Sequence, residues 1–85
     1  MTPDPFTTVD ARGHRCPVPT LKLRKALEEA GPGKAVRLLA TDPMAKVDIP
    51  HFCNENGYKL LTAELDDEVM VFNVIRPVSA PTRDL

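Results

Sequence analysis

Cys16 and its neighbours carry side chains and backbone features that could do chemistry. Gly13 lies before the cysteine, and Pro17 and Pro19 follow it. Glycine suits a tight turn because it tolerates positive φ. Proline suits the first position of a helix, where its missing N–H loses no hydrogen bond. Because a residue before proline is pushed out of the helical conformation, the spacing predicts Cys16 at or next to a helix N-cap.

This predicted position favours an ionised sulfur. A helix N-terminus carries about half a positive charge, which stabilises an anion beside it. Arg12 and Arg15 add positive charge to the same loop, and His14 can add more at low pH. The free backbone donors there are chiefly the N–H groups of Cys16 and Val18. A thiol in such a place can have its pKa lowered from about 8.5, which would make Cys16 a nucleophile. The alternative is a small apolar residue that merely precedes a helix.

Two predicted elements flank this loop and must hold it in place. Residues 6–10 carry β-favouring side chains with a weak alternation, which predicts a short strand. Residues 17–30 predict a helix, and the Gly-Pro-Gly of residues 31–33 ends it. Apolar residues at a spacing of three and four predict its buried face: Leu23, Ala26, Leu27 and Ala30.

Val18 and Leu21 lie on a different side of this helix, next to Cys16. They are open to two interpretations. Apolar residues scattered over a surface are common. A small apolar patch can instead be a docking site, here one by which partner proteins approach the sulfur.

The second half of the chain predicts three more strands. Residues 34–41 are rich in Val and Leu, and residues 59–65 and 69–75 form an antiparallel hairpin around an acidic turn. With a second helix between residues 41 and 59, the order is βαβαββ. Both helices bury their apolar faces most simply on one side of the sheet. We therefore expect an α/β fold, a two-layer sandwich with a four-stranded mixed sheet.

The second helix, residues 44–56, has a complication. Gly57 suits its end, but Pro50 lies inside it. Either the helix kinks at Pro50, or a short turn ends near Val47 and the main helix begins with Asp48 as its cap.

Length and charge limit what the chain can do. Eighty-five residues make a single small domain. The net charge of −1 argues against a nucleic-acid binder that relies on its overall field. The chain shows neither an apolar run long enough to cross a bilayer nor a signal peptide, so we expect a cytoplasmic protein that does not bind membranes.

Two sequence blocks resemble the TusA/SirA family of small sulfur carriers. The first has the pattern Asp-x-x-Gly-x-x-Cys-Pro-x-Pro and comprises Asp10, Gly13, Cys16, Pro17 and Pro19. The second resembles the TusA branch and comprises Asp42, Pro43, Asp48, Ile49, Pro50, Phe52 and Cys53. The resemblance covers a single domain, residues 6–76, and leaves residues 1–5 and 77–85 as flexible ends. The family is also known for the sandwich predicted above.

The resemblance implies that Cys16 carries sulfur as a persulfide. A cysteine desulfurase would donate it, and a downstream protein would accept it, first of all for 2-thiolation of the tRNA wobble uridine. Sulfur oxidation, molybdenum-cofactor sulfuration and selenium handling are further options. Arg12, Gly13, Arg15, Pro17 and Pro19 would form the thiolate environment, and the docking-patch interpretation of Val18 and Leu21 is favoured. We expect a monomer when free, no cofactor and no direct contact with nucleic acid.

Two other functional hypotheses remain open. One is a docking or regulatory module that uses the same loop without moving sulfur. The other is a zinc site, since two His-x-Cys pairs supply suitable ligands: His14 with Cys16, and His51 with Cys53. Residues two apart on a helix face roughly opposite ways, which counts against zinc. Cys53 has the spacing of a core residue, and its alternative role is a resolving thiol for Cys16.

Overall fold

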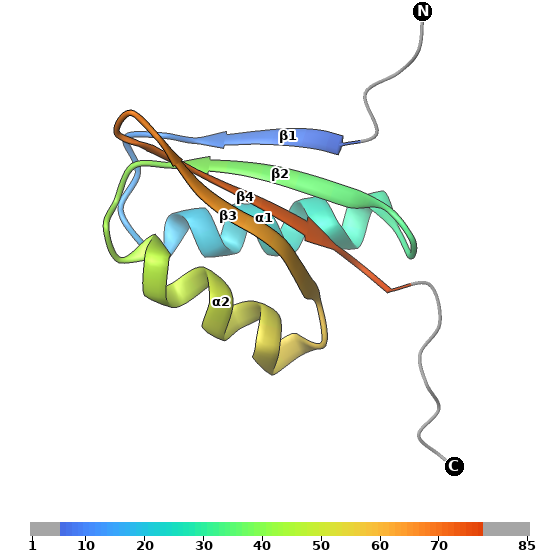
Figure 1. The fold of residues 1–85 in the computed structure, drawn as a ribbon. Coiled ribbons are helices and arrows are strands. Elements are labelled where there is room, and N and C mark those ends of the chain that lie inside the picture. The colour runs from blue at the N-terminus through green and yellow to red at the C-terminus, as the bar shows by residue number, and fades with distance from the viewer. Residues whose placement is uncertain (1–5, 78–85) are drawn as a thin grey trace, which may run out of the picture.

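The described residues, 6–77 of the computed structural model, follow the order βαβαββ (Figure 1). The elements are β1 Phe6–Ala11, α1 Val18–Ala30, β2 Ala35–Ala40, α2 Ala45–Asn56, β3 Lys59–Asp66 and β4 Val69–Ile75. Each boundary lies within one residue of the predicted one. The predicted flexible ends lie outside the described residues, apart from Pro77.

The four strands form one mixed sheet in the order β1-β2-β4-β3. β1 pairs with β2 in parallel, and β4 pairs antiparallel with both β2 and β3. Both helices lie on the same side of this sheet (Figure 1). The predicted two-layer sandwich is therefore confirmed. Within residues 6–77, neither helix is long and apolar enough to span a membrane.

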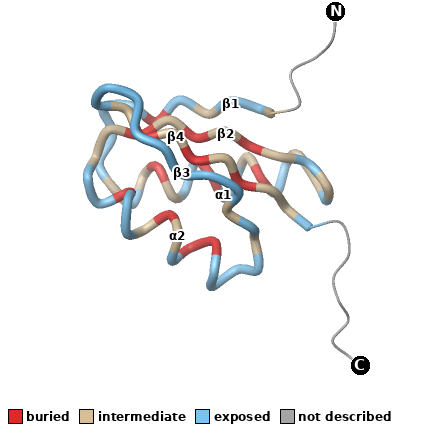
Figure 2. Tube along the Cα trace, viewed as in Figure 1, coloured by how far each residue is buried: buried red, intermediate tan, exposed pale blue. Residues whose placement is uncertain are grey.

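The core lies between the sheet and the helices. Alternate residues of the two central strands are buried: Val36, Leu38 and Ala40 on β2, and Met70, Phe72 and Val74 on β4. The predicted face of α1 meets them, with Leu23 and Leu27 fully buried. The edge strand β3 is exposed along most of its length (Figure 2).

Pro50 lies inside an uninterrupted α2, so the interpretation that α2 begins at Asp48 is wrong. The helix is preceded by a turn in which the Ala45 and Lys46 N–H groups donate to the carbonyls of Asp42 and Pro43. This turn lets the chain enter the helix before Pro50 is reached. Gly57 ends α2 in the left-handed conformation, as predicted.

Candidate functional site

Cys16 lies in the loop between β1 and α1, one residue before the helix cap. Pro17 occupies the N-cap position and Val18 is the first helical residue. The prediction that Cys16 lies next to the N-cap is correct, while Pro17 stands one position earlier than expected. The Cys16 side chain is neither fully buried nor fully exposed. Pro19 is buried in the core, so it anchors this end of α1.

The backbone donors expected to face the sulfur are already occupied. The Cys16 N–H donates to Asp42 Oδ2 over 2.7 Å. The Val18 N–H donates to the Arg15 carbonyl over 2.9 Å. The expectation that these two groups stabilise a thiolate is therefore wrong, because neither has a free hydrogen.

Asp42 fastens this loop to the start of α2. Its Oδ1 accepts from the Met44 N–H over 3.1 Å, while its Oδ2 accepts from Cys16. These two hydrogen bonds, helped by the positive charge of Arg15, lower the pKa of the Asp42 carboxyl. One carboxylate thus holds together two segments that are 26 residues apart in sequence.

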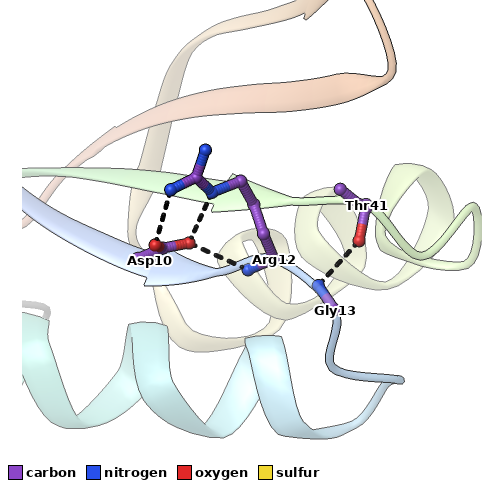
Figure 3. Close-up of polar contacts among 4 residues, drawn as sticks. All are labelled: Asp10, Arg12, Gly13 and Thr41. Carbon is purple, nitrogen blue, oxygen red and sulfur yellow. Dashed lines mark hydrogen bonds and ion pairs between the residues drawn. The ribbon is translucent and has the colours of Figure 1, made fainter.

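Gly13 provides a second attachment. Its φ of 83° lies in the left-handed region, as the turn prediction required. Its N–H donates to Thr41 Oγ1 over 2.8 Å (Figure 3). Thr41 and Asp42, the two residues that follow β2, therefore both hold the Cys16 loop by hydrogen bonds.

Arg12 pairs with Asp10 (Figure 3). Its guanidinium donates to both carboxylate oxygens of Asp10 over 2.8 Å, and its N–H donates over 3.1 Å. These contacts hold the pKa of Asp10 well below its ordinary value. They also raise the pKa of Arg12. Arg12 was predicted to be part of the thiolate environment, but it is not among the charges that shift the pKa of Cys16.

The pKa of the Cys16 thiol is raised, not lowered, and reaches about 11. Burial is the largest cause, because it disfavours the charged sulfur. A hydrogen bond to the Asp48 carboxylate and the negative charges of Asp48 and Asp42 raise it further. The predicted low pKa is wrong because burial and two acidic side chains of the second sequence block all disfavour the thiolate. Sequence reasoning weighed only the basic residues in the cysteine's own loop.

Exposed apolar side chains occur near the starts of both helices. On α1, Val18 is partly buried and Leu21 is 56% exposed. Met44, the N-cap of α2, is 52% exposed, and Val47 in the first turn of that helix is 61% exposed. Met44, Val47 and Asp48 share one helix face, since they are spaced by three and four residues. The Asp48 carboxylate on that face is one of the charges that raise the pKa of Cys16. Sequence analysis did not single out Met44 and Val47, although this spacing was available.

Cys53 lies elsewhere, on the core face of α2, and is 2% exposed. Both cysteines are free thiols. No cluster of three or more metal-ligating side chains occurs within residues 6–77. The His-x-Cys zinc arrangement is therefore not assembled. His14 is exposed in the loop, and His51 lies 3.8 Å from Glu55 on the exposed side of α2.

Comparisons with known proteins agree with this geometry. The family model described as Sulfurtransferase TusA matches residues 7–76. Among solved structures, a SirA-like protein from Desulfitobacterium hafniense is similar, with a TM-score of 0.77 and 26% sequence identity. That similarity covers 85% of this chain and 99% of the other.

Proposed function

The chain belongs to the TusA family of sulfur carriers, and we propose that its Cys16 accepts sulfur from a cysteine desulfurase and relays it to an acceptor protein. The observation that carries this proposal is the position of the thiol. Cys16 is accessible in a loop fastened by hydrogen bonds at Gly13 and at its own N–H. The other cysteine, Cys53, is sealed in the core. The chain thus offers partner proteins one accessible, well-positioned sulfur.

The proposed relay has two steps, and neither changes the net oxidation state. In the first, the Cys16 sulfur attacks the outer sulfur of a desulfurase persulfide. The donor S–S bond breaks, a new S–S bond forms on Cys16, and the donor sulfur leaves as a thiol once it has gained a proton. In the second step an acceptor cysteine attacks the outer sulfur on Cys16 in the same way. The partners supply the chemistry at each end, and the carrier supplies the accessible sulfur.

Partners dock on the apolar surface around the sulfur. We define this docking surface by Val18 and Leu21 of α1 together with Met44, the N-cap of α2, and Val47 of α2. Three of these side chains are more than half exposed. Burying them against a partner is favourable at about 25 cal/mol per Å² of apolar area. Contacts on both sides of Cys16 would direct a partner's sulfur onto it.

The acceptor that we propose belongs to the cytoplasmic system that thiolates the tRNA wobble uridine. The support is the second sequence block, residues 42–53, which resembles the TusA branch in particular. The acceptor protein, not this chain, would contact the tRNA. The free carrier is proposed to be a monomer without a cofactor.

The test is the intact mass of the protein after incubation with a cysteine desulfurase and free cysteine. Wild type should gain one reductant-sensitive sulfur atom, and Cys53→Ser should gain it too. Cys16→Ser should gain none, yet still bind the desulfurase. If wild type gains no sulfur from a desulfurase that loads a known carrier, a docking module becomes the better hypothesis. A gain that requires Cys53 would show that Cys53, and not Cys16, carries the sulfur.

A further inference from the structure

We propose that Thr41 and Asp42 are positioning residues for sulfur transfer, which hold Cys16 at a fixed place relative to the docking surface. This inference rests on the proposed function, and it gives a role in the reaction to two residues that act through the backbone of the Cys16 loop. Loosening this attachment should slow transfer inside the complex and leave binding of the partner intact.

The first step in the argument is that packing alone does not fix the loop. The residues between Ala11 and Cys16 are all exposed, and only the Cys16 side chain packs against the core. Two backbone hydrogen bonds lie within the loop, one from the His14 N–H to Ala11 and one from the Val18 N–H to Arg15. Each spans three residues, so these bonds shape the turn without attaching it to a distant part of the fold.

The second step is that two consecutive residues attach both ends of the loop. The Gly13 N–H donates to Thr41 Oγ1 over 2.8 Å, and the Cys16 N–H donates to Asp42 Oδ2 over 2.7 Å (Figure 3 shows the first bond). Thr41 and Asp42 directly follow β2, which lies between β1 and β4 in the sheet. The loop therefore takes its position from a strand that is paired on both sides.

The third step is that Asp42 also connects the loop to the docking surface. Its Oδ1 accepts from the N–H of Met44, which is 52% exposed and belongs to that surface. These hydrogen bonds lower the pKa of Asp42, so the carboxylate is ionised at neutral pH. Hydrogen bonds to an ionised acceptor are shorter and stronger than neutral ones. A single charged side chain thus sets the place of the Cys16 backbone relative to Met44.

The fourth step is that transfer depends on position more than docking does. The attacking sulfur must reach the outer sulfur of a persulfide that the partner holds in place. A misplacement of about 1 Å can slow such a reaction about 100-fold. A loop released from Thr41 and Asp42 would spend less time where the two sulfurs meet. The exposed side chains of the docking surface would still be there to bind.

The experiment is single-turnover loading of Cys16 by an excess of desulfurase that already carries its persulfide. Intact mass follows the gain of sulfur at several desulfurase concentrations. The measurement gives the maximal loading rate constant and the desulfurase concentration at which half of it is reached. The first reports transfer in the complex, and the second reports binding where transfer is slower than dissociation.

Three variants loosen or restore the attachment. Thr41→Val removes the accepting hydroxyl and keeps the shape of the side chain, so the maximal rate should fall several-fold while the half-saturating concentration changes by less than about twofold. Asp42→Ala loses two hydrogen bonds, and its maximal rate should fall about 10- to 100-fold. Thr41→Ser keeps the hydroxyl and should recover most of the wild-type rate. Circular dichroism checks that each variant is folded.

The matched control is Thr62→Val on β3. The Thr62 hydroxyl also accepts a hydrogen bond, from Asn73 Nδ2 over 2.7 Å, but it lies on an edge strand outside the Cys16 loop. Neither loading parameter should change in this variant. Alkylation of the free carrier by iodoacetamide at pH 8 gives a second control. This small reagent needs no positioned partner, so Thr41→Val should be alkylated at the wild-type rate.

Several outcomes overturn the inference. If Thr41→Val and Asp42→Ala raise the half-saturating concentration and keep the maximal rate, the two residues serve binding and do not position the sulfur. The inference is also wrong if these variants load like wild type, or if Thr62→Val slows loading as much as Thr41→Val does. In each of these cases the carrier function stands. If wild type is not loaded at all, the proposed function fails and this inference fails with it.

Discussion

The two cysteines of this chain have thiols with the same raised pKa, about 11, but the causes differ. Cys53 lies in the core at 2% exposure, and burial alone raises its pKa. At Cys16 burial is again the largest cause, but Asp48 and Asp42 add to it. Burial in the chain's own core is undone only by unfolding. The charge of a neighbouring carboxylate can be removed by a single substitution while the chain stays folded.

The difference follows from the position of each cysteine in the fold. Cys53 is four residues after Ile49 and eight after Ala45, so all three lie on the face of α2 that packs against the sheet. Cys16 instead lies before α1, where its N–H donates to Asp42 and its partly buried side chain packs against the core from outside the helix. The thiol of Cys53 thus packs inside the core, whereas the thiol of Cys16 is partly accessible to other molecules. Four predictions test this contrast.

The largest expected effect is in chemical labelling. Native protein treated with iodoacetamide at pH 8 should be alkylated at Cys16 at least about 100-fold faster than at Cys53. The reason is that a buried thiol reacts only through opening of the fold. Peptide mapping by mass spectrometry after timed quenching measures both rates.

The control for this labelling is the unfolded chain. In 6 M guanidinium chloride the two cysteines should be alkylated at similar rates, since the fold no longer separates them. Comparable native rates would contradict the core placement of Cys53.

The second prediction concerns stability. Cys53→Ser should lower the free energy of unfolding by about 1–3 kcal/mol, because a hydroxyl is buried where a thiol packed against apolar side chains. Cys16→Ser should change it by less than about 0.5 kcal/mol. Urea unfolding followed by circular dichroism gives both values. Equal losses in the two variants would remove the structural distinction between the cysteines.

The regular parts of the fold could be predicted from sequence because local pattern determines them. Leu23 and Leu27 mark the buried face of α1, and Gly57 marks the end of α2. The boundaries lie within one residue because turn residues and apolar periodicity agree at each of them. Sequence alone did not decide whether α2 runs through Pro50 or begins at Asp48. The turn at Asp42 that precedes the helix is held by hydrogen bonds, which residue spacing does not reveal.

The electrostatics of the site could not be predicted in the same way. The position of Cys16 next to a helix cap follows from local sequence, but its pKa depends on burial in the fold and on Asp42 and Asp48, more than 25 residues away. Nearby Arg12 suggested a positive site, yet it is paired with Asp10. A charge acts on whatever the fold brings beside it, so the sign of the shift required the tertiary structure.

The third prediction uses pH to separate the contribution of the Asp42 charge to stability from the contribution of core packing. Asp42 has a lowered pKa in the fold, so its contribution to stability is present above the unfolded value of about 3.9 and is lost as pH falls through the folded value. The Tm difference between wild type and Asp42→Ala should be full at pH 7 and shrink below about pH 4.

Amide hydrogen exchange provides the local measurement for this variant. The Cys16 N–H should exchange faster in Asp42→Ala because it loses its acceptor, whereas the Cys53 N–H inside α2 should not. A Tm difference that stays constant from pH 7 to pH 3 would show that the carboxylate's charge is not involved.

The smallest expected effect is that of Arg12→Ala on Cys16. If the arginines of the loop held the sulfur as a thiolate, removing Arg12 would raise the midpoint of the alkylation pH profile. The structure commits its guanidinium to Asp10, so the midpoint should stay near 11. Asp48→Asn, measured beside it, should lower the midpoint. A rise in Arg12→Ala would mean that the loop's own charges reach the sulfur after all.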